Sequence, residues 1–137
     1  MSPSPNVPAA PPGSPDDKKS GPSVFIVDDD DALVEALSDL LREEGYEVEA
    51  HTVASEALAR LVAGTRPDVI LLDYLMPEMK GDAFLAALDR AGIDVPVMVL
   101  SAMNESRLDV PVRRVRAMIR KPFDLEKLLD ELSRLAA

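Results

Sequence analysis

Residues 69–81 read VILLDYLMPEMKG. Four apolar residues stand together at the start, and Asp73 follows them directly. An unbroken apolar run is typical of a strand in a parallel sheet, because helices cover both of its faces. Pro77 and Gly81 then indicate a shaped loop, since glycine adopts backbone conformations that other residues avoid. The stretch predicts a buried parallel strand that presents an aspartate where it ends.

Other segments of the chain predict four more strands. Residues 24–27 (VFIV) and 97–100 (VMVL) are again unbroken apolar runs. Residues 46–50 alternate in polarity and suit a strand nearer the sheet edge, and residues 117–119 are flanked by arginines, which deter unwanted pairing at the opposite edge. Amphipathic stretches separate the strands, which indicates repeated βα units around a parallel sheet.

Helices are predicted where leucines or alanines recur at helical spacing, and glycines mark three of the ends. The clear helices cover residues 33–41, 54–63, 82–91 and 124–135. A further helix in residues 104–115 would be short or irregular, because Pro111 removes a helical hydrogen bond. The predicted fold class is α/β, a five-stranded parallel doubly wound sheet with about five helices.

Composition excludes several classes of protein. A chain of 137 residues that is 47% apolar fits one domain with its own core. The absence of cysteine excludes disulfides and thiolate metal sites. No apolar run approaches the ~20 residues of a membrane span, and no secretory signal is present, so we expect a cytoplasmic protein without membrane insertion. The formal charge of -10 argues against direct nucleic-acid binding.

Residues 1–22 differ from the rest of the chain. They hold seven of the twelve prolines, together with serine, glycine and alanine. Such a segment buries too little apolar surface to fold, so we predict a disordered Pro/Ser-rich tail followed by a folded domain in residues 23–137. The tail could be a linker, a partner-binding segment or simply the start of the chain.

Chemically capable side chains follow four of the predicted strands. Asp28 and Asp29 come after the first strand, Asp73 after the third, Ser101 after the fourth and Lys121 after the fifth. Ligands of open parallel α/β sheets bind at the carboxyl ends of the strands. We therefore expect three carboxylates, one hydroxyl and one ammonium to meet at one edge.

Clustered carboxylates repel one another unless a cation lies among them. Hard oxygen ligands favour Mg²⁺, which would screen an incoming phosphate from the acids. Asp73 could then attack as a nucleophile, and Ser101 and Lys121 could donate to phosphoryl oxygens.

Four motifs stand in order at these strand ends: Asp28-Asp29-Asp30, Leu-Leu-Asp73-Tyr-Leu-Met-Pro77-Glu-Met-Lys-Gly81, Leu-Ser101-Ala102 and Lys121-Pro122-Phe123. They are separated by 44 residues from Asp29 to Asp73, 28 from Asp73 to Ser101 and 20 from Ser101 to Lys121. Over about residues 23–137 the chain resembles the receiver domain of response regulators, the phosphoacceptor modules of two-component signalling.

The resemblance implies a flavodoxin-like strand order of 2-1-3-4-5 and a signalling module rather than an enzyme. It implies a Mg²⁺ site made of Asp28, Asp29, Asp73 and the backbone carbonyl of Leu75. Asp73 would accept a phosphoryl group from a histidine kinase or a histidine phosphotransfer protein. Ser101 would reach toward that group on activation, and Lys121, set by a cis bond to Pro122, would pair with it.

Two features depart from the family pattern. Met118 stands where family members usually carry an aromatic switch residue, so an aromatic rotamer change cannot be the readout. Residues 104–122 contain six basic residues against Glu105 and Asp109. A solvated edge would explain them, but we expect this segment to dock an acidic downstream target protein.

Three functional hypotheses remain. The leading one is a stand-alone receiver, since the chain runs only to Leu135-Ala136-Ala137 at the end of the last predicted helix. The alternative is a phosphorylation-independent pseudo-receiver, a pure interaction module. A small magnesium-dependent phosphohydrolase is a weaker rival, because Leu75 stands where such enzymes usually place a second carboxylate.

Other polar residues have simpler interpretations. Asp30 and Asp31 suit the start of a helix, where capping and the helix dipole favour carboxylates. Asp68 is predicted to lie at strand entry, at the end of the sheet away from the site. His51 has no second ligand nearby in sequence, so we expect a surface residue without a metal or catalytic role.

Overall fold

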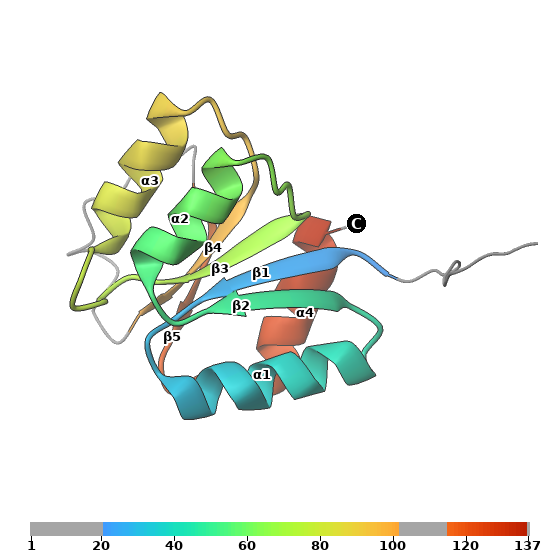
Figure 1. The fold of residues 1–137 in the computed structure, drawn as a ribbon. Coiled ribbons are helices and arrows are strands. Elements are labelled where there is room, and N and C mark those ends of the chain that lie inside the picture. Colours follow the sequence, from blue (N-terminus) through green and yellow to red (C-terminus); the bar gives the residue numbers. More distant parts are fainter. Residues whose placement is uncertain (1–20, 102–114, 137) are drawn as a thin grey trace, which may run out of the picture.

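The computed structural model describes residues 21–101 and 115–136, and within them five strands and four helices succeed one another (Figure 1). Their bounds are β1 Ser23–Val27, α1 Asp31–Glu43, β2 Glu47–His51, α2 Ala54–Val62, β3 Val69–Asp73, α3 Gly81–Arg90, β4 Val97–Ser101, β5 Val115–Arg120 and α4 Leu125–Ala136. The helix predicted in residues 104–115 falls on residues outside the described ranges, apart from Val115, which opens β5. Most of the tail predicted for residues 1–22 also lies outside them.

The five strands form one parallel sheet in the order β2-β1-β3-β4-β5. Helices α1 and α4 cover one face, and α2 and α3 cover the other (Figure 1). This doubly wound arrangement confirms the predicted fold class and strand order. It also brings the carboxyl ends of all five strands to one edge.

The core consists of two apolar layers, one on each face of the sheet. In the layer between the sheet and helices α2 and α3, Phe25 and Phe84 are fully buried. In the layer between the sheet and helices α1 and α4, Leu41 and Leu128 are fully buried. Side chains of β3 alternate between the two layers, and all five of its residues are buried. The first four residues of the strand are all apolar because they pack into both layers.

The ends of the elements mostly agree with the sequence patterns. Asp30 is the N-cap of α1, since its side chain accepts from the Leu33 N–H at 3.1 Å. Gly45 follows the helix with φ of 99°, a conformation that favours glycine. The outer strands are shifted or longer than predicted: β2 begins one residue later, and β5 starts at Val115, because pairing with β4 extends back to Val97.

Gly81 is required for a different reason from the one predicted. It is not among the glycines with positive φ, and it is the buried first residue of α3. A Cβ atom there would lie 2.5 Å from Cδ1 of Tyr74. Space against the tyrosine ring, rather than backbone freedom, excludes a side chain at this position.

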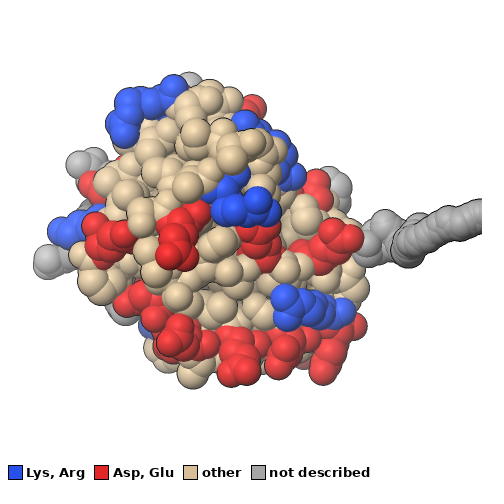
Figure 2. Space-filling view, viewed as in Figure 1, with Lys and Arg blue, Asp and Glu red and all other residues tan. Residues whose placement is uncertain are grey.

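Part of the formal charge of -10 lies on α1. Figure 2 shows a row of acidic side chains along this helix. The exposed members spaced four residues apart are Asp31, Glu35, Asp39 and Glu43. Among the helices of the described residues, none has the length and apolar character that crossing a membrane requires.

Candidate functional site

The candidate site lies at the carboxyl ends of β1, β3, β4 and β5. Backbone hydrogen bonds continue the sheet pairing just beyond the strands: Asp28 N–H donates to the His51 carbonyl at 3.2 Å, and Lys121 N–H donates to the Ser101 carbonyl at 2.8 Å. The residue after the third strand is tied in the same way, with Tyr74 N–H donating to the Leu100 carbonyl at 2.9 Å. The sheet itself therefore fixes the backbone from which the candidate side chains project.

Three carboxylates meet at this edge, as the sequence predicted. Asp28, Asp29 and Asp73 each offer one oxygen, and these three atoms lie within 4.8 Å of one another. Asp28 is fully buried and Asp73 nearly so, whereas Asp29 is exposed. Within residues 21–101 and 115–136, this is the only cluster of three or more acidic or histidine side chains arranged to share a metal ion.

Lys121 reaches into the cluster. Its Nζ donates to Oδ2 of Asp28 at 2.9 Å and lies 3.5 Å from Oδ1 of Asp73. Burial alone would lower the pKa of Lys121, but the Asp28 hydrogen bond and the two nearby negative charges outweigh it and raise that pKa. The Lys121–Pro122 peptide bond is cis. Its contacts with Asp28 and Asp73 make Lys121 a fixed part of the site and not an ordinary surface residue.

The carboxyl group of Asp73 holds its proton more tightly than a free aspartate does. Burial raises its pKa from 3.8 to about 6, and the charge of Asp28 adds to the effect. The Lys121 ammonium and the Leu75 N–H, which donates to Oδ1 of Asp73 at 3.4 Å, act in the opposite direction without cancelling it. The three carboxylates are therefore incompletely neutralised by the side chains around them.

These residues fit a magnesium ion. All the donors are oxygen atoms, which hard divalent cations prefer, and the exposed Asp29 leaves a side open for the waters that Mg²⁺ retains. One ammonium faces three carboxylates among the described side chains of the cluster. A divalent cation would complete the neutralisation.

Ser101 and Leu75 lie at the same edge in different surroundings. Ser101 is buried as the last residue of β4, paired with Arg120 of β5. The Leu75 side chain is 44% exposed, so it contributes little packing there. Leu75 lies opposite Lys80 in an antiparallel bridge, which closes the loop that follows Asp73.

Met118 and the arginines of β5 are partly described. Met118 is half-buried and packs against the core layer beneath α2 and α3, while Arg116 and Arg120 are exposed. Three other basic residues of the predicted docking segment lie with Pro111 in residues 102–114, outside the described part of the chain: Arg107, Arg113 and Arg114.

The simpler interpretations had mixed outcomes. Asp68 lies at the opposite end of the sheet, where its Oδ2 accepts from the Ser23 N–H at 2.8 Å, as expected for strand entry. The prediction of a surface histidine was wrong. His51 is half-buried, with its ring 5.1 Å from the ring of Phe25 and Nε2 2.7 Å from Oε2 of Glu49. The contacts with Phe25 and Glu49 cover part of the His51 ring.

Sequence reasoning missed Glu78. This residue hydrogen-bonds the first turn of α2 through Ser55, 23 positions earlier in the chain. One signal was available: Val53, the N-cap of α2, has no side chain that can cap a helix. A helix start without its own capping side chain leaves backbone N–H groups that a side chain from another element can bond.

Comparisons with known proteins agree with this arrangement. The sequence model of the family described as response regulator receiver domain matches residues 24–133. Response regulator MprA of Mycobacterium sp. (strain KMS) is 37% identical over 114 residues, which are 82% of this chain and 49% of that protein. The chain spans about half the length of the curated relatives it matches.

Solved structures give the same result. The Francisella response regulator 1452 receiver domain superposes with a TM-score of 0.76 at 27% identity, covering 85% of this chain and 97% of that one. Response regulator TrrA of Thermotoga maritima, in complex with Mg²⁺-BeF, gives 0.73 at 26% identity, with 83% and 98% covered. With its fold, its acidic strand-end cluster and the family match, this chain belongs to the response regulator receiver domains of two-component signalling.

Proposed function

We propose that Asp73 is the phosphoacceptor of this receiver domain. The observation that carries the proposal is the trio of carboxylate oxygens within 4.8 Å of one another, with Lys121 beside Asp28 and Asp73 at the end of the sheet. Asp28, Asp29 and Asp73, with the Leu75 carbonyl, would hold Mg²⁺. When bound, the ion would screen the phosphoryl charge from the acids and stabilise charge on its equatorial oxygens.

The side chains have separate roles in the transfer. A carboxylate oxygen of Asp73 attacks phosphorus in line and forms an O–P bond. The P–N bond of a phosphohistidine on the donor breaks, and its electron pair returns to the imidazole nitrogen. Lys121 donates to a phosphoryl oxygen while it keeps its hydrogen bond to the buried Asp28, and the Ser101 hydroxyl donates to another.

The partners follow from this chemistry. The donor is a histidine kinase or a histidine phosphotransfer protein, and the output is a downstream target protein that docks on residues 104–122. The exposed Arg116 and Arg120 of β5 support an acidic target, since both project from the edge strand. The stand-alone organisation and the cytoplasmic location stay predictions.

No observation among the described residues favours the phosphorylation-independent alternative. An interaction module without the chemistry would have no need of three carboxylates at one edge, where their repulsion costs stability. Ser101 and Lys121 stand at the same edge as the acids.

The decisive experiment is incubation with a small phosphodonor, with and without Mg²⁺, followed by intact-mass measurement. Wild type should gain one phosphoryl group only with Mg²⁺, and Asp73→Asn should gain none. Asp68→Asn is the matched control, because Asp68 lies at the far end of the sheet and should leave phosphorylation unchanged. Labelling of Asp73→Asn, or labelling of wild type in a chelator, would reject the assignment.

A further inference from the structure

The loop between β3 and α3 joins the candidate phosphoacceptor to the rest of the domain. It is closed on itself: Gly81 N–H donates to the Tyr74 carbonyl at 2.7 Å, and Leu75 lies opposite Lys80 in an antiparallel bridge. The hydrogen bond of this bridge joins Tyr74 and Gly81, which flank the paired residues. The Leu75 N–H therefore donates to Oδ1 of Asp73 instead. The backbone of this loop is therefore in direct contact with the acceptor.

Glu78 holds the tip of this loop against α2, and Figure 1 shows the loop beside the N-terminal end of that helix. Oε1 of Glu78 accepts from the Ser55 N–H at 3.0 Å, and Oε2 accepts from the Ser55 hydroxyl at 2.6 Å. These bonds lower the pKa of Glu78, so the group is a carboxylate at neutral pH. Both of its oxygens are engaged by one residue of the helix.

The contact supplies what each side lacks. Helix α2 has Val53 at its N-cap, with no capping side chain of its own, so Glu78 satisfies a backbone N–H of the first turn. The loop in turn has two apolar anchors, since Met76 is buried in the core and the partly buried Met79 packs against it. Leu75 is largely exposed, and between these two methionines Glu78 supplies a polar attachment to α2.

We propose that Glu78 is a positioning residue for the phosphoryl site. By holding the first turn of α2 through Ser55, it restrains the loop and with it the Leu75 backbone beside Asp73. The inference rests on the function proposed above and adds a residue to it. The hydrogen bonds of Glu78 go to Ser55 and not to the carboxylate trio or Lys121. Its effect on the site therefore passes through the backbone of the loop, whose Leu75 N–H donates to Asp73.

The effect should appear as weaker metal binding. A loosened loop samples more conformations, and Mg²⁺ binding must then select the productive one. Glu78→Ala should raise the Mg²⁺ dissociation constant about 5-fold, less than the roughly 10-fold loss for a side chain that contacts a metal ligand directly. Glu78→Gln, which keeps an oxygen for the Ser55 N–H, should fall between wild type and alanine.

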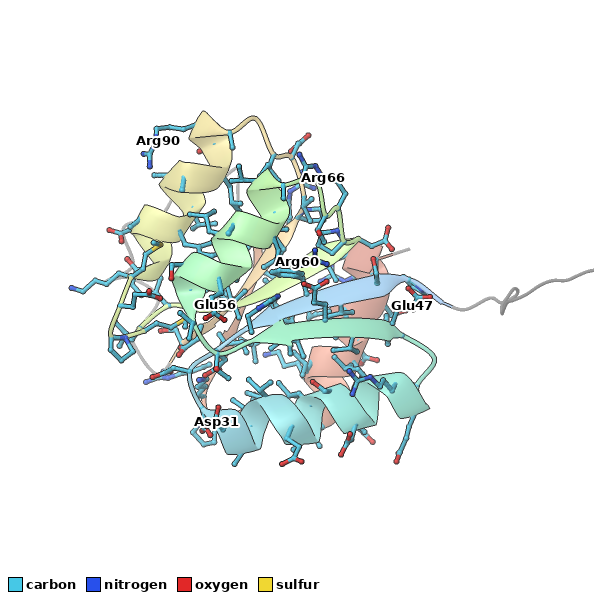
Figure 3. The ribbon with its side chains drawn as sticks, viewed as in Figure 1. Asp31, Glu47, Glu56, Arg60, Arg66 and Arg90 are labelled. Carbon is cyan, nitrogen blue, oxygen red and sulfur yellow. The ribbon has the colours of Figure 1, made fainter. Side chains whose placement is uncertain are left out.

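The experiment is calorimetric titration of Mg²⁺ into the whole chain, with the melting temperature measured separately in chelator. Glu56→Ala is the matched control: Glu56 is an exposed acid in the same first turn of α2 (Figure 3), so its loss weakens the helix without touching the loop. Its Mg²⁺ dissociation constant should equal that of wild type, whatever happens to its melting temperature.

A double-mutant cycle completes the test. Ser55→Ala should raise the dissociation constant less than Glu78→Ala does, and combining the two should add little to Glu78→Ala alone, because both remove one contact. If Glu78→Ala fails to fold, Ser55→Ala and Glu78→Gln still measure the effect. An unchanged Mg²⁺ dissociation constant in these variants, with a lowered melting temperature, would mean that Glu78 only caps α2. Failure of wild type itself to bind Mg²⁺ would instead reject the proposed function.

Discussion

Two clusters of charged side chains lie on the same sheet, and their carboxylates are neutralised to different degrees. At the strand ends, Asp28, Asp29 and Asp73 share one lysine, and burial with the charge of Asp28 raises the pKa of Asp73 to about 6. On β2, the single carboxylate of Glu49 has two partners, Arg60 and His51. Arg60 holds both of its oxygens, at 2.8 and 3.0 Å, and His51 lies 2.7 Å from one of them.

The two pKa values therefore move in opposite directions. Hydrogen bonds from Arg60 are the main reason that the pKa of Glu49 falls from 4.5 to about 2, and His51 adds to them against the effect of burial. Figure 3 shows Arg60 reaching from α2 toward the strands beneath it. The Glu49 cluster is complete within the protein and serves structure, whereas the strand-end cluster has an excess of negative charge that a cation and a phosphoryl donor can use.

Removing the cation from each cluster should give the largest contrast. Lys121→Met keeps an apolar stem but leaves the fully buried Asp28 without its ammonium, so we expect a loss of about 3 kcal/mol of unfolding free energy in chelator. Mg²⁺ should recover part of that loss. Arg60→Met should cost clearly less than that, because its ion pair is largely exposed. Equal losses in the two variants, by urea titration, would contradict the comparison.

Removing a charge from the crowded cluster should stabilise the metal-free protein. Because the folded pKa of Asp73 lies above its unfolded value, the folded state is penalised once the group ionises, and stability falls as pH rises from about 4 through 6. Asp73→Asn should remove that penalty and add on the order of 2 kcal/mol at pH 7 in chelator. The gain should vanish at pH 4. If Asp73→Asn were less stable than wild type at pH 7, ionised Asp73 would not destabilise the folded state.

Magnesium binding should depend on pH in the same range. The ion must displace the Asp73 proton, so its dissociation constant should change little above pH 7 and rise roughly tenfold per pH unit below the pKa of about 6. Calorimetric titrations at about pH 7.5, 6 and 5 check this. A dissociation constant that stays constant down to pH 5 would mean that Asp73 is already ionised there.

The smallest change in stability is expected for a substitution in the Glu49 cluster. The pKa of Glu49 is lower in the folded state, so its contribution is present above pH 4.5 and is lost as pH falls toward 2. Glu49→Gln should therefore lower stability by less than about 1 kcal/mol at pH 7, since the pair is exposed, and by nothing at pH 2. Acid-unfolding curves of the two proteins should converge as pH falls. A difference that persists unchanged at pH 2 would assign the effect to packing instead.

Much of the fold and of the site could be predicted from the sequence. The unbroken apolar run before Asp73 predicted a central strand, and Asp30 predicted the start of α1. Both signals act within one element, where the cause and its effect are a few residues apart. Because all strands run parallel, knowing where each ends was enough to bring Asp28 and Lys121 to the edge that carries Asp73.

The tertiary structure alone decided which side chains touch across elements. The sequence held no periodicity that pairs Glu78 with Ser55, or Glu49 with Arg60, because those contacts depend on how a loop and a helix pack on the sheet. Gly81 likewise owes its identity to the nearby ring of Tyr74. The sequence by itself determined that an acidic site exists and where it lies. Only packing determined how far each charge is buried and neutralised, because both depend on neighbours from distant parts of the chain.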